Sequence, residues 1–99
     1  MNSKAAGLLG LAARARKIVS GESVLAGIQN KSAKLVLIAQ DASDNTKKRF
    51  TDKCTYYNVE FIFVDTSAEL NQAIGTQNRK VIAVTDEGFA KNLHTCLKG

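Results

Sequence analysis

The 99-residue chain is 44% hydrophobic and 23% charged, and 14 Lys and Arg residues against nine Asp and Glu residues give a formal net charge of +5. A chain of this length can bury one hydrophobic core but not two, so residues 1–99 are expected to form a single domain. The apolar N-terminal stretch is interrupted by Lys4, Arg14, Arg16 and Lys17, which argues against a membrane span and a signal peptide and indicates a cytoplasmic protein.

Helical and extended patterns alternate in the first half of the chain. The first apolar stripe lies at helical spacing and predicts a helix; it consists of Ala5, Leu8, Leu9 and Ala12. Ser20-Gly21 interrupts this pattern, and a short second helix is expected to begin near Glu22. Residues 35–39 (LVLIA) form an apolar run that is typical of a strand covered on both faces.

The second half repeats this alternation. Ser43 and Asp44 are typical helix-start residues, and the third helix is expected to turn Phe50, Cys54 and Tyr57 inward. Residues 61–64 and 81–84 predict two more buried strands. Between them, Thr66-x-x-Glu69 matches a capping box that opens a helix, and Gly75 is expected to close it. The last helix should present four residues to the core: Phe89, Leu93, Cys96 and Leu97.

This order of elements predicts an α/β fold, a three-layer α/β/α sandwich with a central mixed sheet of about four strands. Strands that alternate with helices favour parallel neighbours, with helices on both faces of the sheet. A short strand around Lys17 to Val19 could add a fourth, antiparallel member.

The strand-end loops and the titratable residues give little support to an enzyme. Asp41, Asp65 and Asp86 follow three strands and could form a carboxylate cluster, but aspartates at strand ends more often satisfy turns and helix starts. The chain has no phosphate-binding P-loop and no GxGxxG sequence. Cys54 and Cys96 are far apart in the sequence, without a CxxC motif or a Cys/His cluster, and the only histidine, His94, has no obvious nucleophile beside it. Neither a metal site nor a cofactor is therefore expected, and a binding function is favoured over catalysis.

The positive charge is concentrated in one half of the chain. Residues 1–55 carry a net +6, whereas residues 56–99 carry −1. Such polarity favours a phosphate-rich partner such as nucleic acid, although lysines that only keep a small domain soluble are the alternative. The backbone N–H groups of a helix that begins after Gly21 could hold an RNA backbone or base edge. The alternative here is that Ser20-Gly21 simply ends one element and caps the next.

Three segments resemble one known family, in order and over nearly the whole chain. They are GLLGLAARARKIVSGE, AKLVLIAQDASDNTKKRFTDKCTYYNV and VIAVTDEGFAKNL. They are similar to the bacterial YlxQ group of the L-seven-Ae family of ribosomal and kink-turn RNA-binding proteins. The resemblance implies a non-catalytic α/β/α sandwich that recognises the sharply bent kink-turn with its tandem sheared G·A pairs.

The resemblance also implies two RNA-contacting segments. In the family, a glycine turn followed by an Asn-Glu or Lys-Gln pair enters the groove at the G·A pairs, and a lysine supports it one turn later. The turn here reads Ser20-Gly21-Glu22-Ser23, with Ala26 or Gly27 at the lysine position. The loop before the final strand, apolar in many relatives, reads Thr76-Gln77-Asn78-Arg79-Lys80 after Gly75, which favours phosphate or base-edge contacts.

These observations together predict a monomeric protein that binds structured RNA, a kink-turn or related bent motif, and is associated with the ribosome. The expected RNA-binding residues are Arg14, Arg16, Lys17, Ser20, Gly21, Glu22, Ser23, Lys31, Asp41, Thr76, Gln77, Asn78, Arg79 and Lys80. The alternative is a protein–protein interaction module on the same scaffold that does not bind RNA directly.

Overall fold

A computed structural model describes residues 2–98 of the chain. It contains five α-helices and four β-strands: α1 (Ser3–Arg14), β1 (Ile18–Ser20), α2 (Glu22–Gln29), β2 (Leu35–Ala39), α3 (Asp44–Tyr57), β3 (Phe61–Val64), α4 (Ser67–Ile74), β4 (Val81–Val84) and α5 (Glu87–Lys98). The helix and strand order expected from the sequence is therefore confirmed.

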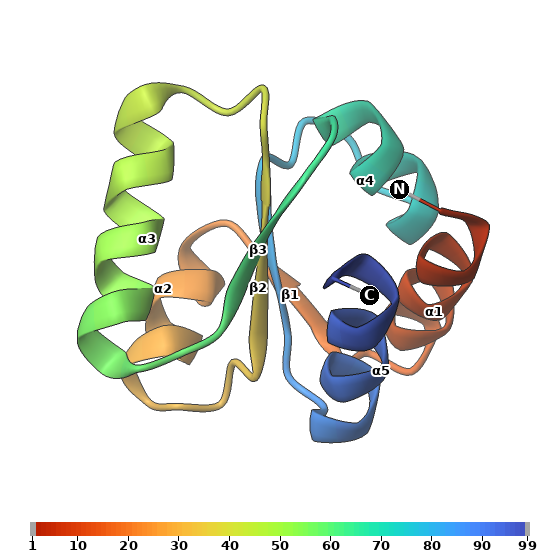
Figure 1. The fold of residues 1–99 in the computed structure, drawn as a ribbon, viewed down its shortest axis with the longest axis horizontal. Helices are drawn as coiled ribbons and strands as arrows, with labels where there is room; N and C mark the ends of the chain where they lie inside the picture. The colour runs from red at the N-terminus through yellow and green to blue at the C-terminus, as the bar shows by residue number, and fades with distance from the viewer. Residues whose placement is uncertain (1, 99) are drawn as a thin grey trace.

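The elements form three layers around one four-stranded mixed sheet. Helices α2 and α3 cover one face of the sheet, and α1, α4 and α5 cover the other (Figure 1). All five residues of β2 are buried, because alternate side chains enter the two cores: Leu35, Leu37 and Ala39 on the α1/α4/α5 side, Val36 and Ile38 on the α2/α3 side. The predicted α/β/α sandwich is confirmed.

Local capping explains where several helices begin and end. The Ser43 hydroxyl accepts the Thr46 N–H at 3.2 Å at the start of α3, and the Thr66 hydroxyl accepts the Glu69 N–H at 3.2 Å at the start of α4. Gly75 ends α4 in the left-handed conformation, with φ of 73°. These are the residues at which the sequence predicts these boundaries.

The strand order differs from the parallel arrangement that the alternation favours. The order is β1-β4-β2-β3; only β2 and β3 pair in parallel, whereas β4 runs antiparallel to both β1 and β2. Since β4 runs in the opposite direction, the loop after it lies at the opposite end of the strands from the loops after β2 and β3. Asp86 is thereby separated from Asp41 and Asp65, and its carboxylate instead accepts the Phe89 N–H at 2.9 Å at the start of α5.

Strand β3 is also less buried than expected. Its apolar sequence predicts a buried strand, but it is an edge strand in which Phe61 is half-buried and Phe63 exposed. Four consecutive apolar residues cannot distinguish a central strand from an edge strand, because pairing depends on distant segments.

The two cysteines lie on separate helices and are not bonded to each other. Cys54 on α3 is buried, and burial raises the pKa of its thiol to about 11, while Cys96 on α5 is half-buried. None of the helices within residues 2–98 combines the length and apolar character that crossing a bilayer requires.

Candidate RNA interface

The directions of the strands bring three segments that are far apart in the sequence to the same end of the sheet. β1 and β2 finish at this end of the sheet and the antiparallel β4 begins there, as the pairing of Ser20 with Ile82 and of Ile38 with Val81 shows. We call this region the Gly21 end. It consists of Ser20–Ser23, Asp41 and Thr76–Lys80, and thus unites most of the RNA-binding residues that the sequence predicts.

Gly21 forms a turn that other residues adopt only with strain. Its φ of 64° and ψ of −138° lie in a region that strongly favours glycine. A Cβ atom at this position would also lie 3.3 Å from a guanidinium nitrogen of Arg79. Because Gly21 is the N-cap and has no side chain, no side-chain oxygen caps α2. The turn therefore leaves backbone N–H groups at the start of α2 open to a ligand.

Asn71 of α4 holds the 76–80 loop in place. Its buried side-chain amide donates to the carbonyl oxygens of Ser67 and Arg79, at 2.6 and 3.0 Å. Its oxygen accepts the Thr76 hydroxyl at 2.8 Å and the Arg79 N–H at 3.1 Å. An asparagine amide has two donor and two acceptor positions, and all four are used here. The backbone of Arg79 is thereby fixed while its side chain extends beside Gly21.

Asp41 links the loop after β2 to the start of α4 and to Lys80. Its carboxylate accepts the Ser67 hydroxyl at 2.7 Å and the Ser67 N–H at 2.9 Å. The Lys80 ammonium lies 3.4 Å from Asp41 and 3.0 Å from the Ser67 hydroxyl. The hydroxyl bond from Ser67 is the main cause that lowers the pKa of Asp41 below its ordinary value of 3.8. Both oxygens of the Asp41 carboxylate therefore already accept hydrogen bonds from Ser67, and these bonds stabilise the Gly21 end.

Three residues of this region are absent from the sequence-based set. Asn71 and Ser67 build the network just described, and the Arg49 guanidinium on α3 lies 3.8 Å from the Glu22 carboxylate on α2. The one sequence signal for Asn71 is a polar residue beside Leu70 on the inward side of α4. Arg49 gives no such signal, because the contact between α2 and α3 is tertiary.

The remaining predicted cations do not join the Gly21 end. The Lys17 carbonyl accepts the Thr85 N–H, and the Lys34 N–H donates to the Val84 carbonyl, so both lie where β4 ends. We call this opposite region the Lys17 end; it consists of Arg16, Lys17, Lys31 and Lys34. The Lys31 ammonium donates to the Tyr57 carbonyl at the C-terminus of α3, an arrangement that stabilises a helix. Arg14 lies elsewhere again, lining a hollow with Gly75.

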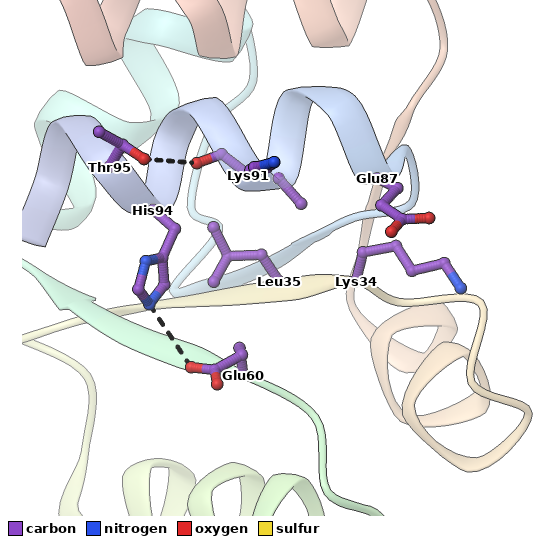
Figure 2. Close-up of a pocket in the computed structure, with 8 residues that line it drawn as sticks. Lys34, Leu35, Glu60, Glu87, Lys91, His94 and Thr95 are labelled. Carbon is purple, nitrogen blue, oxygen red and sulfur yellow. Dashed lines mark hydrogen bonds and ion pairs between the residues drawn. The ribbon is translucent and has the colours of Figure 1, made fainter.

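A wider hollow of about 570 Å³ lies near the Lys17 end, between α5 and the beginnings of β2 and β3 (Figure 2). The His94 imidazole faces Glu60 across it, with 3.5 Å between Nε2 and the carboxylate. Lys34 and Glu87 extend side by side at its other end (Figure 2). Opposite charges alternate around its rim, so it lacks the single sign of charge that a phosphate or metal site requires. No group of three His, Cys, Asp or Glu side chains within residues 2–98 is placed to hold a metal ion.

Comparison with known proteins identifies the family. The family described as "Ribosomal protein L7Ae/L30e/S12e/Gadd45 family" matches residues 3–94, which is most of the chain. The chain belongs to this family. Within it, the chain is 55% identical over 91 residues to the RNA-binding protein YlxQ of Bacillus subtilis (strain 168), covering 91% of each protein. It is 45% identical over 97 residues to RNA-binding protein YlxQ of Enterococcus faecium, covering 97% of this chain and 93% of that protein.

Two solved structures superimpose on this chain over nearly its whole length. A protein of unknown function from Bacillus halodurans C superimposes with a TM-score of 0.94 at 39% identity, covering 99% of this chain and 100% of that one. The Giardia lamblia 15.5kD RNA binding protein superimposes with a TM-score of 0.80 at 19% identity, covering 99% and 91%. The second likeness shows a shared fold.

Proposed function

We propose that the protein binds structured RNA without catalysis and that the Gly21 end is the surface that meets the RNA. The observation that carries the proposal is that the Gly21 turn and the Arg79 side chain lie together at one end of the sheet. They come from segments that are far apart in the sequence. Membership of the family and the printed name of the 55% identical relative, an RNA-binding protein, support it.

The arrangement suits a bent RNA better than a single strand. Gly21 allows an RNA backbone to approach closely, and the open N–H groups at the start of α2 are donors for phosphate oxygens or base edges. Single-stranded RNA is usually held by stacked aromatic side chains, and neither Ser20–Ser23 nor Thr76–Lys80 contains one. We therefore propose a kink-turn or related bent motif as the target.

The basic side chains have different parts in this proposal. Arg79 contacts phosphates beside the turn, since Asn71 fixes its backbone and leaves its guanidinium exposed. Lys80 contributes charge from a position held by Asp41 and Ser67. Arg14, beside Gly75, can contact an RNA strand that continues past the loop. The Lys17 end lies at the opposite end of the sheet. In this proposal it contacts a long RNA only after that RNA has bound at the Gly21 end.

We further propose that the protein is a cytoplasmic monomer that acts in or beside the ribosome. One experiment tests the central claim: purified protein is titrated with a kink-turn RNA and with an unbent duplex of equal length at two salt concentrations. We expect tighter binding to the kink-turn, and weaker binding to both as salt rises, because neutralised phosphates release counterions. Equal affinity for the two RNAs would contradict shape recognition. Affinity for neither would favour the alternative, a protein–protein interaction module.

A further inference from the structure

Helix α3 carries the most exposed large hydrophobic side chain among residues 2–98. Tyr56, near the C-terminus of the helix, is 80% exposed, whereas Leu11 is 53% and Phe63 38% exposed. Its ring meets the ring of Tyr57 edge-to-face, with 4.8 Å between the centroids, and Tyr57 packs against the core between the sheet and α2 and α3. The Tyr56 ring therefore has a fixed neighbour but keeps most of its surface open to solvent. One exposed aromatic residue is ordinary on a protein surface, so its surroundings decide what it can bind.

Cations lie on both sides of this ring along the chain. Lys53 is three residues before Tyr56, and residues at this spacing are neighbours on the surface of a helix. Within residues 2–98, its ammonium group has no hydrogen-bond or ion-pair partner. On the other side, the Lys31 ammonium donates to the carbonyl of Tyr57, the residue after Tyr56. A lysine ammonium has three N–H donors, so Lys31 keeps two for a further acceptor.

The rest of the α3 surface adds positive charge. Residues 47–57 contain four Lys and Arg residues against one carboxylate, that of Asp52, which gives a net charge of +3. Lys48 is exposed, and its ammonium group also has no partner among the described residues. Arg49 contacts Glu22 and so connects this surface with the Gly21 end. An aromatic ring among unpaired cations matches a nucleotide, whose base stacks on the ring while its phosphates meet the charges.

We propose that α3 binds single-stranded RNA at Tyr56, with one base stacked on the ring and the two flanking phosphates contacted by Lys53 and Lys31. We call these three residues the Tyr56 site. Stacking accepts any base, so the site holds a strand without reading its sequence. The proposal rests on the proposed function, because the strand is the unpaired continuation of an RNA held at the Gly21 end.

The course of α3 provides the path between the two sites. The helix begins near the end of the sheet where β2 finishes and runs toward the end where β2 begins (Figure 1). Arg49 lies beside Glu22, and Tyr56 follows seven residues later, roughly 10 Å along the helix axis. At about 3.4 Å per nucleotide along a stacked strand, this distance corresponds to roughly three nucleotides. A short single-stranded extension of the RNA is therefore long enough to reach Tyr56.

Proton NMR of the tyrosine ring tests the stacking directly. The chain has two tyrosines, so Tyr57→Phe leaves Tyr56 as the one tyrosine whose ring protons are observed. Single-stranded hexa-adenylate RNA at low salt should shift these protons upfield, because a stacked base shields them. An abasic hexamer of the same charge should shift them much less. Equal shifts with the two hexamers, or no shift with hexa-adenylate, would overturn the proposal. So would a hexa-glutamate peptide that competes as well as the RNA, since that result would indicate an acidic protein partner.

Substitutions separate stacking from charge. Tyr56→Phe keeps the ring and should bind hexa-adenylate like the parent protein, whereas Tyr56→Leu should bind it roughly five- to a hundredfold more weakly. Lys53→Gln should weaken binding and reduce its salt dependence. Lys91→Gln, at an exposed position on α5, is the matched control and should have little effect. Unchanged binding in Tyr56→Leu would contradict the stacking, and equal losses in the two lysine variants would leave only diffuse attraction.

A further pair of measurements distinguishes this site from the Gly21 end. Arg79→Gln with Lys80→Gln should still bind hexa-adenylate with the upfield shift at Tyr56. Tyr56→Leu should still prefer a kink-turn RNA to an unbent duplex when neither has single-stranded ends. Loss of hexa-adenylate binding in the Arg79 and Lys80 variant would place the single strand at the Gly21 end and contradict the Tyr56 site. Failure of the kink-turn preference in the parent protein would contradict the proposed function but leave the stacking result standing.

Discussion

The two ends of the sheet both carry basic residues but hold them in different ways. At the Gly21 end, the amide of Asn71 and the carboxylate of Asp41 connect α4, the 76–80 loop and the loop after β2. At the Lys17 end, the Lys31 and Lys34 ammonium groups donate to backbone carbonyls near helix ends. Cations in the first region are presented on a fixed loop, whereas those in the second stabilise the fold locally. Charge counted along the sequence does not distinguish these roles.

The strongest test of this difference is removal of the network at its centre. Asn71→Ala should lower the free energy of unfolding by about 2–4 kcal/mol, because Arg79 and Ser67 lose hydrogen-bond partners at a buried position. The melting temperature should fall by roughly 10–20 °C. RNA affinity should fall as well, measured at a temperature where the variant is folded, because the 76–80 loop is no longer fixed.

Asn92→Ala supplies the control for this change. Asn92 is exposed on α5, and its truncation should leave both melting temperature and RNA affinity almost unchanged. A variant of Asn71 that melts like the control and binds RNA normally would show that the loop is held by something else.

The next effect in size concerns the turn itself. Gly21→Val places a branched side chain at φ of 64° and near the Arg79 guanidinium, so we expect a loss of about 1–3 kcal/mol in stability. RNA binding should also weaken, since the side chain occupies the space where the RNA backbone approaches. Gly7→Val is the matched control, because a Cβ there meets no atom within 4 Å. Comparable losses in the two variants would remove any special role for the Gly21 turn.

The helix and strand boundaries follow from local chemistry, and for that reason they can be predicted from the sequence. Ser43, Thr66 and Gly75 act on their immediate neighbours. The reversal of β4 and the edge position of β3 depend on pairing between segments far apart, which apolar periodicity does not encode. The same distinction applies to the site: resemblance groups Gly21 with the 76–80 loop, but Asn71 becomes visible only through its tertiary hydrogen bonds.

Two adjacent Arg-Lys pairs allow the two ends to be compared at equal charge. Arg79→Gln with Lys80→Gln should weaken RNA binding by about 1–3 kcal/mol, roughly ten- to a hundredfold. The slope of log affinity against log salt should shrink by roughly 0.7–0.9 for each phosphate that the variant no longer neutralises. Both pairs should leave the fold intact by circular dichroism, since these four residues are exposed.

Arg16→Gln with Lys17→Gln removes the same charge from the Lys17 end. Gln rather than Ala replaces each cation, so that an extended polar side chain remains at Arg16, whose φ is 60°. This pair should change affinity for a short kink-turn RNA much less than the Arg79 and Lys80 pair. Equal losses would mean that only diffuse electrostatic attraction holds the RNA.

The smallest expected effect is a change in acid stability at the Gly21 end. The pKa of Asp41 is lowered in the folded protein, so its hydrogen bonds stabilise the fold above the ordinary pKa of 3.8 and are lost as pH falls through the lower folded value. Asp41→Asn cannot lose this contribution on acidification. Its melting temperature should therefore lie below that of the parent protein at neutral pH but fall less on acidification through the carboxylate range. Asp52→Asn, at an exposed position on α3, should keep the acid dependence of the parent. If Asp41→Asn and Asp52→Asn respond to acid alike, the Asp41 network contributes no pH-dependent stability, and the two ends of the sheet differ less than their hydrogen bonds indicate.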